Sequence, residues 1–261
     1  MLKIGINRTL VGFLVCAGAL LAQSRTYLAQ GSTYTTTFAL TENPISESGK
    51  WMNGGVAGAN LWGNIQTTPG LAFGVSEPTQ FGDPTAVLTG SWSADQAVQA
   101  TVRINTAPGG TCCHEAEVRL RTTIAPSRIT GYEAYCSVMS NNPYCHIASW
   151  GGPNGAWVNM ENSSPNIFLK NVDILKGTVT GANPAIITMY INGAQILQVQ
   201  DTGNFTFSDS RKYGPWTSGS PGIGFYNNQD SNWNRFGFSS FAAQNLGAGA
   251  PTPPTNLKIT P

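Results

Sequence analysis

Charge is scarce in this sequence. Only 10% of its 261 residues are Asp, Glu, Lys or Arg, the formal net charge is +1, and there are two histidines. A chain so close to neutral has no electrostatic basis for binding nucleic acid or an anionic membrane, so we expect neither as a partner. Intrinsic disorder is excluded too, because disordered chains carry more charge and fewer aromatics than the 10% found here.

Helical periodicity, internal repeats and membrane-length apolar runs are also lacking. Short apolar runs instead alternate with turns rich in the 30 Gly and 16 Pro residues. This pattern predicts an all-β domain over residues 35–243, a two-sheet antiparallel sandwich. The expected strands are residues 86–89, 97–104, 115–124, 132–139, 146–150, 157–160, 167–169, 172–179, 186–191, 194–200, 222–226 and 236–243.

The N-terminus has the features of a secretory signal peptide. Lys3 and Arg8 precede an apolar run, residues 10–22, and small residues lead up to Ser24. We expect residues 1–24 to be removed and the mature protein to be secreted or periplasmic. We also expect a monomer. Residues 25–34 would then be an N-terminal segment, and residues 244–261 a Gly-, Ala- and Pro-rich tail.

Four cysteines follow the leader: Cys112, Cys113, Cys136 and Cys145. An even number in an exported protein predicts two disulfides. Cys136 and Cys145 flank a turn signal and could face each other across a hairpin, whereas a bridge between neighbours is strained. All three pairings stay open. His114 and His146 each follow a cysteine, but their spacing matches no zinc module.

The most charged segment is Glu115 to Arg121. Alternate residues of a strand share a face, so we expect Glu115, Glu117, Arg119 and Arg121 on one side and the apolar residues between them in the core. Carboxylates two residues apart on a strand lie about 7 Å from each other, a separation that suits glycoside hydrolysis by Glu115 and Glu117.

A polysaccharide lyase is the other enzymatic hypothesis. It needs a cation, a base and an acid, which Arg119, Arg121, Tyr135 and His146 could supply. The alternative to both is structural: the charged residues pair with one another on a solvated face of the sheet. Such exposed pairs contribute only about 0–1 kcal/mol to stability.

Aromatic residues favour sugar binding, since pyranose rings stack on indoles. Trp150 and Trp157 end a tight loop that contains Asn154, and Trp233 follows Asn232 in a polar loop. We expect these residues, with Arg121, to contact carbohydrate; the alternative is that the tryptophans are core. No cofactor is required. A structural Ca²⁺ is the one ion that we consider, with Asp83, Asp209 and Asp230 in loops as candidate ligands.

The C-terminal half shows a recognisable order of motifs. Tyr190-Ile191-Asn192-Gly193 precedes Pro221-Gly222-Ile223-Gly224 and a last strand near Phe238–Phe241. Over residues 35–243 the chain resembles laminin-G-like and related jelly rolls of the concanavalin A-like lectin/glucanase superfamily, including bacterial members of uncharacterised function. The resemblance implies an antiparallel jelly roll that contacts carbohydrate.

The resemblance does not extend to the catalytic motifs of that superfamily. Laminarinase-like families carry Glu-x-Asp-x-Glu, and here Arg119 stands in the slot of the third acid. Glu117-Val118-Arg119 resembles the Glu-Leu-Arg of alginate lyase-type jelly rolls, whose Gln-x-His and Tyr-x-Lys motifs are absent. We therefore expect a secreted module that binds polysaccharide through its concave face and rim loops. The alternatives are a lyase or hydrolase acting through Glu115–Arg121, and a structural or adhesive surface domain.

Overall fold

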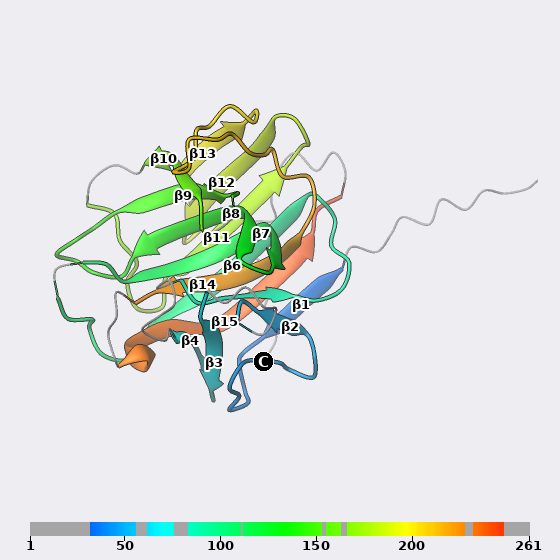
Figure 1. The fold of residues 1–261 in the computed structure, drawn as a ribbon. Coiled ribbons are helices and arrows are strands. Elements are labelled where there is room, and N and C mark those ends of the chain that lie inside the picture. The colour runs from blue at the N-terminus through cyan, green and yellow to red at the C-terminus, as the bar shows by residue number, and fades with distance from the viewer. Residues whose placement is uncertain are drawn as a thin grey trace, which may run out of the picture. The chain divides into compact units, whose positions relative to one another are not determined.

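Two antiparallel sheets form the body of the protein in a computed structural model, which describes residues 32–55, 62–75, 83–110, 112–152, 155–162, 166–227 and 232–247 (Figure 1). The leader, Asn154, Asp230 and residues 248–261 of the tail lie outside these ranges. Within them, no helix has the length and apolar character that a membrane crossing requires.

The first sheet has the strand order β13-β12-β11-β6-β15-β4-β3, and β1 also pairs with β15. Its strands are β1 (Thr33–Thr36), β3 (Asn64–Thr68), β4 (Leu71–Val75), β6 (Gln96–Ile104), β11 (Ile174–Thr180), β12 (Ala185–Ile191), β13 (Ala194–Asp201) and β15 (Phe236–Asn245).

The second sheet has the order β10-β9-β8-β7-β14-β5-β2. Its strands are β2 (Trp51–Asn53), β5 (Thr85–Leu88), β7 (Glu115–Ala125), β8 (Arg128–Ser137), β9 (Cys145–Trp150), β10 (Trp157–Asn162) and β14 (Ser220–Tyr226). A single 3₁₀ turn, η1 (Trp233–Arg235), precedes β15 among the described residues.

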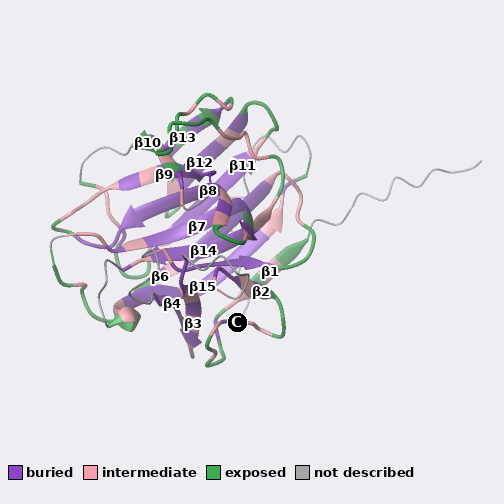
Figure 2. Cartoon of the chain, in the orientation of Figure 1, coloured by how far each residue is buried: buried purple, intermediate pink, exposed green. Residues whose placement is uncertain are grey.

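The main core lies between the sheets. Ala116, Val118 and Leu120 of β7 are buried in it together with Val98 and Val102 of β6, as the alternating pattern predicts. Residues on the other face of β7 and β8 are buried as well, so both strands are almost wholly buried (Figure 2). Polar side chains on that second face are therefore held in a protein environment rather than in water.

The predicted strands are confirmed with one exception. Residues 167–169 form no strand; Leu169 is buried and its N–H donates to the carbonyl of Ser137 at 2.8 Å. Strands β1 to β4 were not predicted: each has only three to five residues, and β1 to β3 also mix polar with apolar residues. The turn at Asn192-Gly193 joins β12 to β13 with both φ angles positive, as its sequence predicts.

Arg121 does not share the face of Glu117 and Arg119, so the predicted row of four charges is wrong at its last position. The pairing of β7 with β8 shifts register between Leu120 and Thr123, and Arg121 has a φ of 47°. At this bulge the guanidinium donates to the carbonyl of Trp216, in the loop before β14, at 2.6 Å and to that of Gly181, just after β11 of the other sheet, at 2.7 Å.

Both cysteine pairs are bonded. Cys136 and Cys145 lie opposite each other on β8 and β9 and form a disulfide, as the intervening turn favours. The second disulfide joins the adjacent residues Cys112 and Cys113, which come just before β7. A disulfide between adjacent residues is the pairing that we expected least, because its geometry is strained.

Candidate functional site

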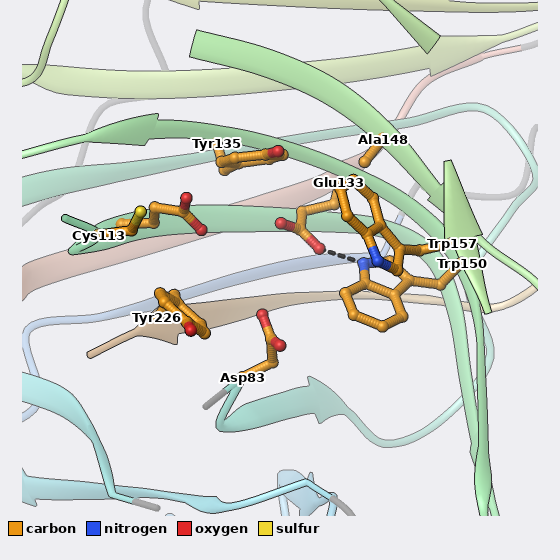
Figure 3. Close-up of a pocket in the computed structure, with 9 residues that line it drawn as sticks. Asp83, Cys113, Glu133, Tyr135, Ala148, Trp150, Trp157 and Tyr226 are labelled. Atoms are coloured by element: carbon orange, nitrogen blue, oxygen red, sulfur yellow. Dashed lines mark hydrogen bonds between the residues drawn. The ribbon is translucent and has the colours of Figure 1, made fainter. Parts of the chain in front are cut away.

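A pocket of about 310 Å³ opens on the face of the second sheet that is turned away from the core (Figure 3). Most of its lining comes from four neighbouring strands, β14, β7, β8 and β9, with β10 at one edge. The lining residues are Asp83, Cys113, Glu115, Glu133, Tyr135, Ala148, Trp150, Trp157 and Tyr226. Its size is that of a small-ligand site.

Arg119 links two of the carboxyl groups at this face. Its Nη2 lies 2.6 Å from Oε2 of Glu117, and its Nη1 lies 2.8 Å from Oε2 of Glu133. The guanidinium carbon is 5.5 Å from the ring centre of Trp150. All three charged side chains are buried. Arg119 is thus paired with two carboxylates inside the protein and is not exposed to a ligand.

A glycine on β14 makes space for this group. Gly224 pairs with Glu117, and a Cβ at this position would lie 2.1 Å from Oε2 of Glu117 and 2.7 Å from Nε of Arg119. Any side chain here would therefore displace the ion pair. The side chains of Glu117 and Arg119 on β7 occupy the space that a side chain at position 224 of β14 would fill.

Two tryptophans form one wall of the pocket. Trp150 and Trp157 lie opposite each other on β9 and β10, with ring centres 6.3 Å apart and planes inclined by 32°. Trp150 is buried and donates its indole N–H to Glu133, whereas Trp157 is 40% exposed. Trp157 is thus a large apolar surface at the rim, held by the ring behind it.

Burial raises the pKa of all four carboxyl groups. For Glu115 the pKa rises to about 8, with the Tyr144 hydroxyl donating to its Oε1 and opposing the rise. Burial and then the charge of Glu133 raise the pKa of Asp83 to about 7. Burial likewise raises the pKa of Glu117 and Glu133, although Arg119 opposes both shifts. Glu115, with a pKa of about 8, is therefore protonated at neutral pH.

Tyr135 lines the pocket, but His146 lies beside it rather than in its lining. The Tyr135 hydroxyl donates to Oδ1 of Asn159 at 2.8 Å, and burial raises the pKa of Tyr135 above its usual range. The His146 ring centre is 5.3 Å from that of Tyr135 and 5.4 Å from that of Tyr144. These aromatic contacts fix the histidine in the sheet.

The structure therefore brings together some of the predicted site residues and separates others. Glu115, Tyr135, Trp150 and Trp157 line the pocket, with Glu117 and Arg119 beside them on β7. Trp233 is elsewhere: it packs against Leu71, Phe73 and Val75 of the first sheet, and the exposed Asn232 precedes it. Arg121 is bound to the carbonyls of Trp216 and Gly181 instead, and Asn154 lies outside the described residues.

The calcium candidates do not form a cluster. Asp83 lines the pocket, Asp209 accepts a hydrogen bond from the Tyr213 hydroxyl at 2.7 Å, and Asp230 lies outside the described residues. Across the described ranges, no group of three or more His, Cys, Asp or Glu side chains is arranged to hold a metal ion. Calcium binding stays a prediction.

Five lining residues were missed as parts of this site: Asp83, Cys113, Glu133, Ala148 and Tyr226. Glu133 lies opposite Arg119 only because of the β7 bulge, which strand alternation does not reveal. Asp83 stands before β5 and Tyr226 ends β14, so both reach the site across the sheet. The strand that contains Tyr226 was predicted from the sequence. Its register with β7, which places Tyr226 opposite Glu115, was not.

Comparisons with known proteins support the fold alone. No protein-family model and no curated protein sequence matches the chain. Among solved structures, β-agarase B from Zobellia galactanivorans matches with a TM-score of 0.52 at 12% identity, covering 83% of this chain and 94% of that one. A β-agarase A in complex with oligoagarose matches with a TM-score of 0.50 at 11% identity and the same coverage.

A third similar structure is the carbohydrate-binding module CBM66 from Bacillus subtilis, with a TM-score of 0.48, 13% identity, and 78% of this chain and 96% of that one covered. The two agarase structures and the sheet order agree with the fold expected from the sequence motifs. The chain has the all-β, concanavalin A-like jelly-roll fold.

Proposed function

We propose that the pocket of the second sheet binds a carbohydrate, and that the protein is a secreted module that attaches to a polysaccharide. The proposal rests on Trp157, a 40% exposed indole at the rim of a pocket whose lining also includes three carboxyl groups and two tyrosine hydroxyls. A pyranose has the matching surfaces, an apolar C–H face and a ring of hydroxyls. The volume of about 310 Å³ is adequate for one sugar unit.

In this arrangement a sugar ring stacks on Trp157, and Glu115, Glu133 and Asp83 bind its hydroxyls. A protonated carboxyl group both donates and accepts hydrogen bonds, so the raised pKa values of Glu115 and Asp83 suit a ligand with hydroxyl groups of both roles. The similar β-agarase A structure contains bound oligoagarose, which is consistent with this class of ligand.

The test is binding of the mature protein to a panel of neutral, amino and uronate oligosaccharides, measured by titration calorimetry. Trp157→Ala should weaken binding of the bound glycan about tenfold or more, which corresponds to about 1.4 kcal/mol. Trp233→Ala is the matched control, since that tryptophan lies outside the pocket, and it should leave affinity unchanged. Equal affinities of wild type and Trp157→Ala would exclude stacking at this site.

Hydrolysis is the second candidate, and the state of Glu115 favours it. A carboxyl group with a pKa of about 8 is protonated at neutral pH and can act as a general acid. Burial raises the pKa of Glu133, but Arg119 opposes that rise and so favours the ionised form, which is the form that acts as a base or nucleophile. Release of reducing ends by wild type but not by Glu115→Gln or Glu133→Gln would establish this activity. A lyase is disfavoured, because Arg119 is already paired and Arg121 is remote from the pocket.

A further inference from the structure

The charge of the pocket limits which carbohydrate it can accept. Four carboxyl groups belong to this region of the sheet: those of Glu117 and Glu133 pair with the guanidinium of Arg119, and those of Asp83 and Glu115 line the same pocket as Glu133. None of the described lining residues is a Lys, Arg or His. Ionisation of these groups gives the cluster an excess of negative charge. Uronates and sulfated sugars oppose that ionisation, whereas an ammonium group favours it, because a nearby positive charge lowers the pKa of a carboxyl group.

The carboxyl groups also repel one another in the free protein. The charges of Glu133, Asp83 and Glu115 each raise the pKa of Glu117, after burial as the largest cause. In addition, Oε1 of Glu117 is buried without a hydrogen-bond partner. A buried acceptor that lacks a donor is costly. Glu117 lies beside the pocket rather than in its lining, so a positively charged group in the pocket would act on its carboxyl group through its field and reduce the repulsion.

The aromatic lining supplies the second requirement for binding a cation. Four rings border the same pocket, those of Tyr135, Trp150, Trp157 and Tyr226. The face of an aromatic ring attracts ammonium groups, and aromatic residues combined with carboxylates are a recurring means of binding them. Figure 3 shows Asp83 and Tyr226 on one side of the pocket and Tyr135 and Glu133 on the other.

We propose that the sugar bound by this pocket carries a free amino group, as in a polymer of glucosamine. This inference rests on the carbohydrate-binding function proposed above and specifies its ligand. The ammonium group lies among the carboxyl groups, and the sugar ring stacks on Trp157. An N-acetylated sugar has the same ring but no charge, so it loses the electrostatic part of this interaction.

The experiment compares two ligands that differ only in this group, the β-1,4-linked glucosamine hexamer and its fully N-acetylated counterpart, with cellohexaose and a hexauronate beside them. Titration calorimetry with the mature protein at neutral pH should show the free amine binding at least tenfold more tightly than the acetylated hexamer and no binding of the hexauronate. Raising the ionic strength should reduce this preference.

Variants separate a specific site from general attraction. Asp83→Asn and Glu115→Gln should reduce the amine preference severalfold, whereas Asp173→Asn, which changes a carboxylate outside the pocket, should leave it unchanged. Equal or tighter binding of the acetylated hexamer, cellohexaose or the hexauronate would overturn the amino-sugar inference and leave carbohydrate binding in place. Failure of every oligosaccharide to bind would overturn both.

Discussion

Glu133 and Arg119 lie directly opposite each other on β8 and β7, and Oε2 of the glutamate is 2.8 Å from Nη1 of the arginine. Both side chains are buried, so each charge has lost its hydration and depends on the opposite charge to offset that loss. A buried pair of this kind contributes less to stability than its short distance suggests, but breaking it leaves one charge without a counterion. The pair therefore makes the pocket sensitive to single changes.

The first prediction concerns this pair. Arg119→Met should lower the free energy of unfolding by about 3–5 kcal/mol, because Glu117 and Glu133 then lose their only guanidinium partner. The double variant Arg119→Met/Glu133→Gln should recover part of the loss. Urea unfolding of the two single variants and the double variant measures the coupling, and additive effects would show that the pair acts independently.

The second prediction concerns Gly224. Gly224→Ala places a Cβ 2.1 Å from Oε2 of Glu117, so the ion pair must move, and we expect a loss of about 1–3 kcal/mol together with weakened glycan binding. Gly109→Ala is the control, because a Cβ there meets nothing within 4 Å. Thermal unfolding that is the same for both variants would contradict the close packing at Gly224.

The third prediction is the dependence of stability on pH. The pKa of Glu115 is about 8 in the folded protein against 4.5 for the unperturbed group, and that of Asp83 is about 7 against 3.8. The folded state then binds more protons than the unfolded state between these values. This contribution to stability is complete below about pH 4 and is lost as the pH rises toward 8, by up to about 1.4 kcal/mol per pH unit for each group.

Denaturant unfolding from pH 4 to 9 checks this expectation. Glu115→Gln should flatten the decline, because its amide does not titrate, whereas Glu161→Gln should keep the wild-type slope, since Glu161 is exposed on β10. A Glu115→Gln profile parallel to that of the wild type would show that burial does not raise the pKa of this group.

The fourth prediction concerns the two disulfides. Cys136 and Cys145 are nine residues apart, and opening a loop of that size costs about 2.5–3 kcal/mol by chain entropy. Replacing both by Ala should lower the free energy of unfolding by roughly that amount. The Cys112→Ala/Cys113→Ala variant should change it much less, because a bond between neighbours closes no chain loop. Similar losses in the two variants would argue against the entropic account.

Much of the fold could be predicted from the sequence, because its longer strands are bounded by clear turns and alternate between polar and apolar residues. Glu115, Glu117 and Arg119 were assigned to the correct face for this reason. Arg121 and Glu133 could not be placed, since one extra residue in β7 changes the register and moves side chains to the opposite face.

Trp157 and Trp233 show a second limit of sequence interpretation. Both stand in or beside polar loops, and their local sequences do not distinguish them. Trp157 reaches the pocket because β10 pairs with β9, whereas Trp233 packs on Leu71 and Phe73 of the other sheet. Which of two similar tryptophans can meet a ligand is decided by long-range strand pairing, which the local pattern does not contain.

The glycine at position 224 has a consequence for finding related proteins. Acidic residues and arginines occur in many strands for unrelated reasons, but a strand residue that must lack a side chain because a neighbouring ion pair fills its place is a far rarer requirement. A distant relative with the same charged group should carry glycine at the equivalent point of its own β14. Gly224 is therefore a more selective marker of this site than the charged residues that it accommodates.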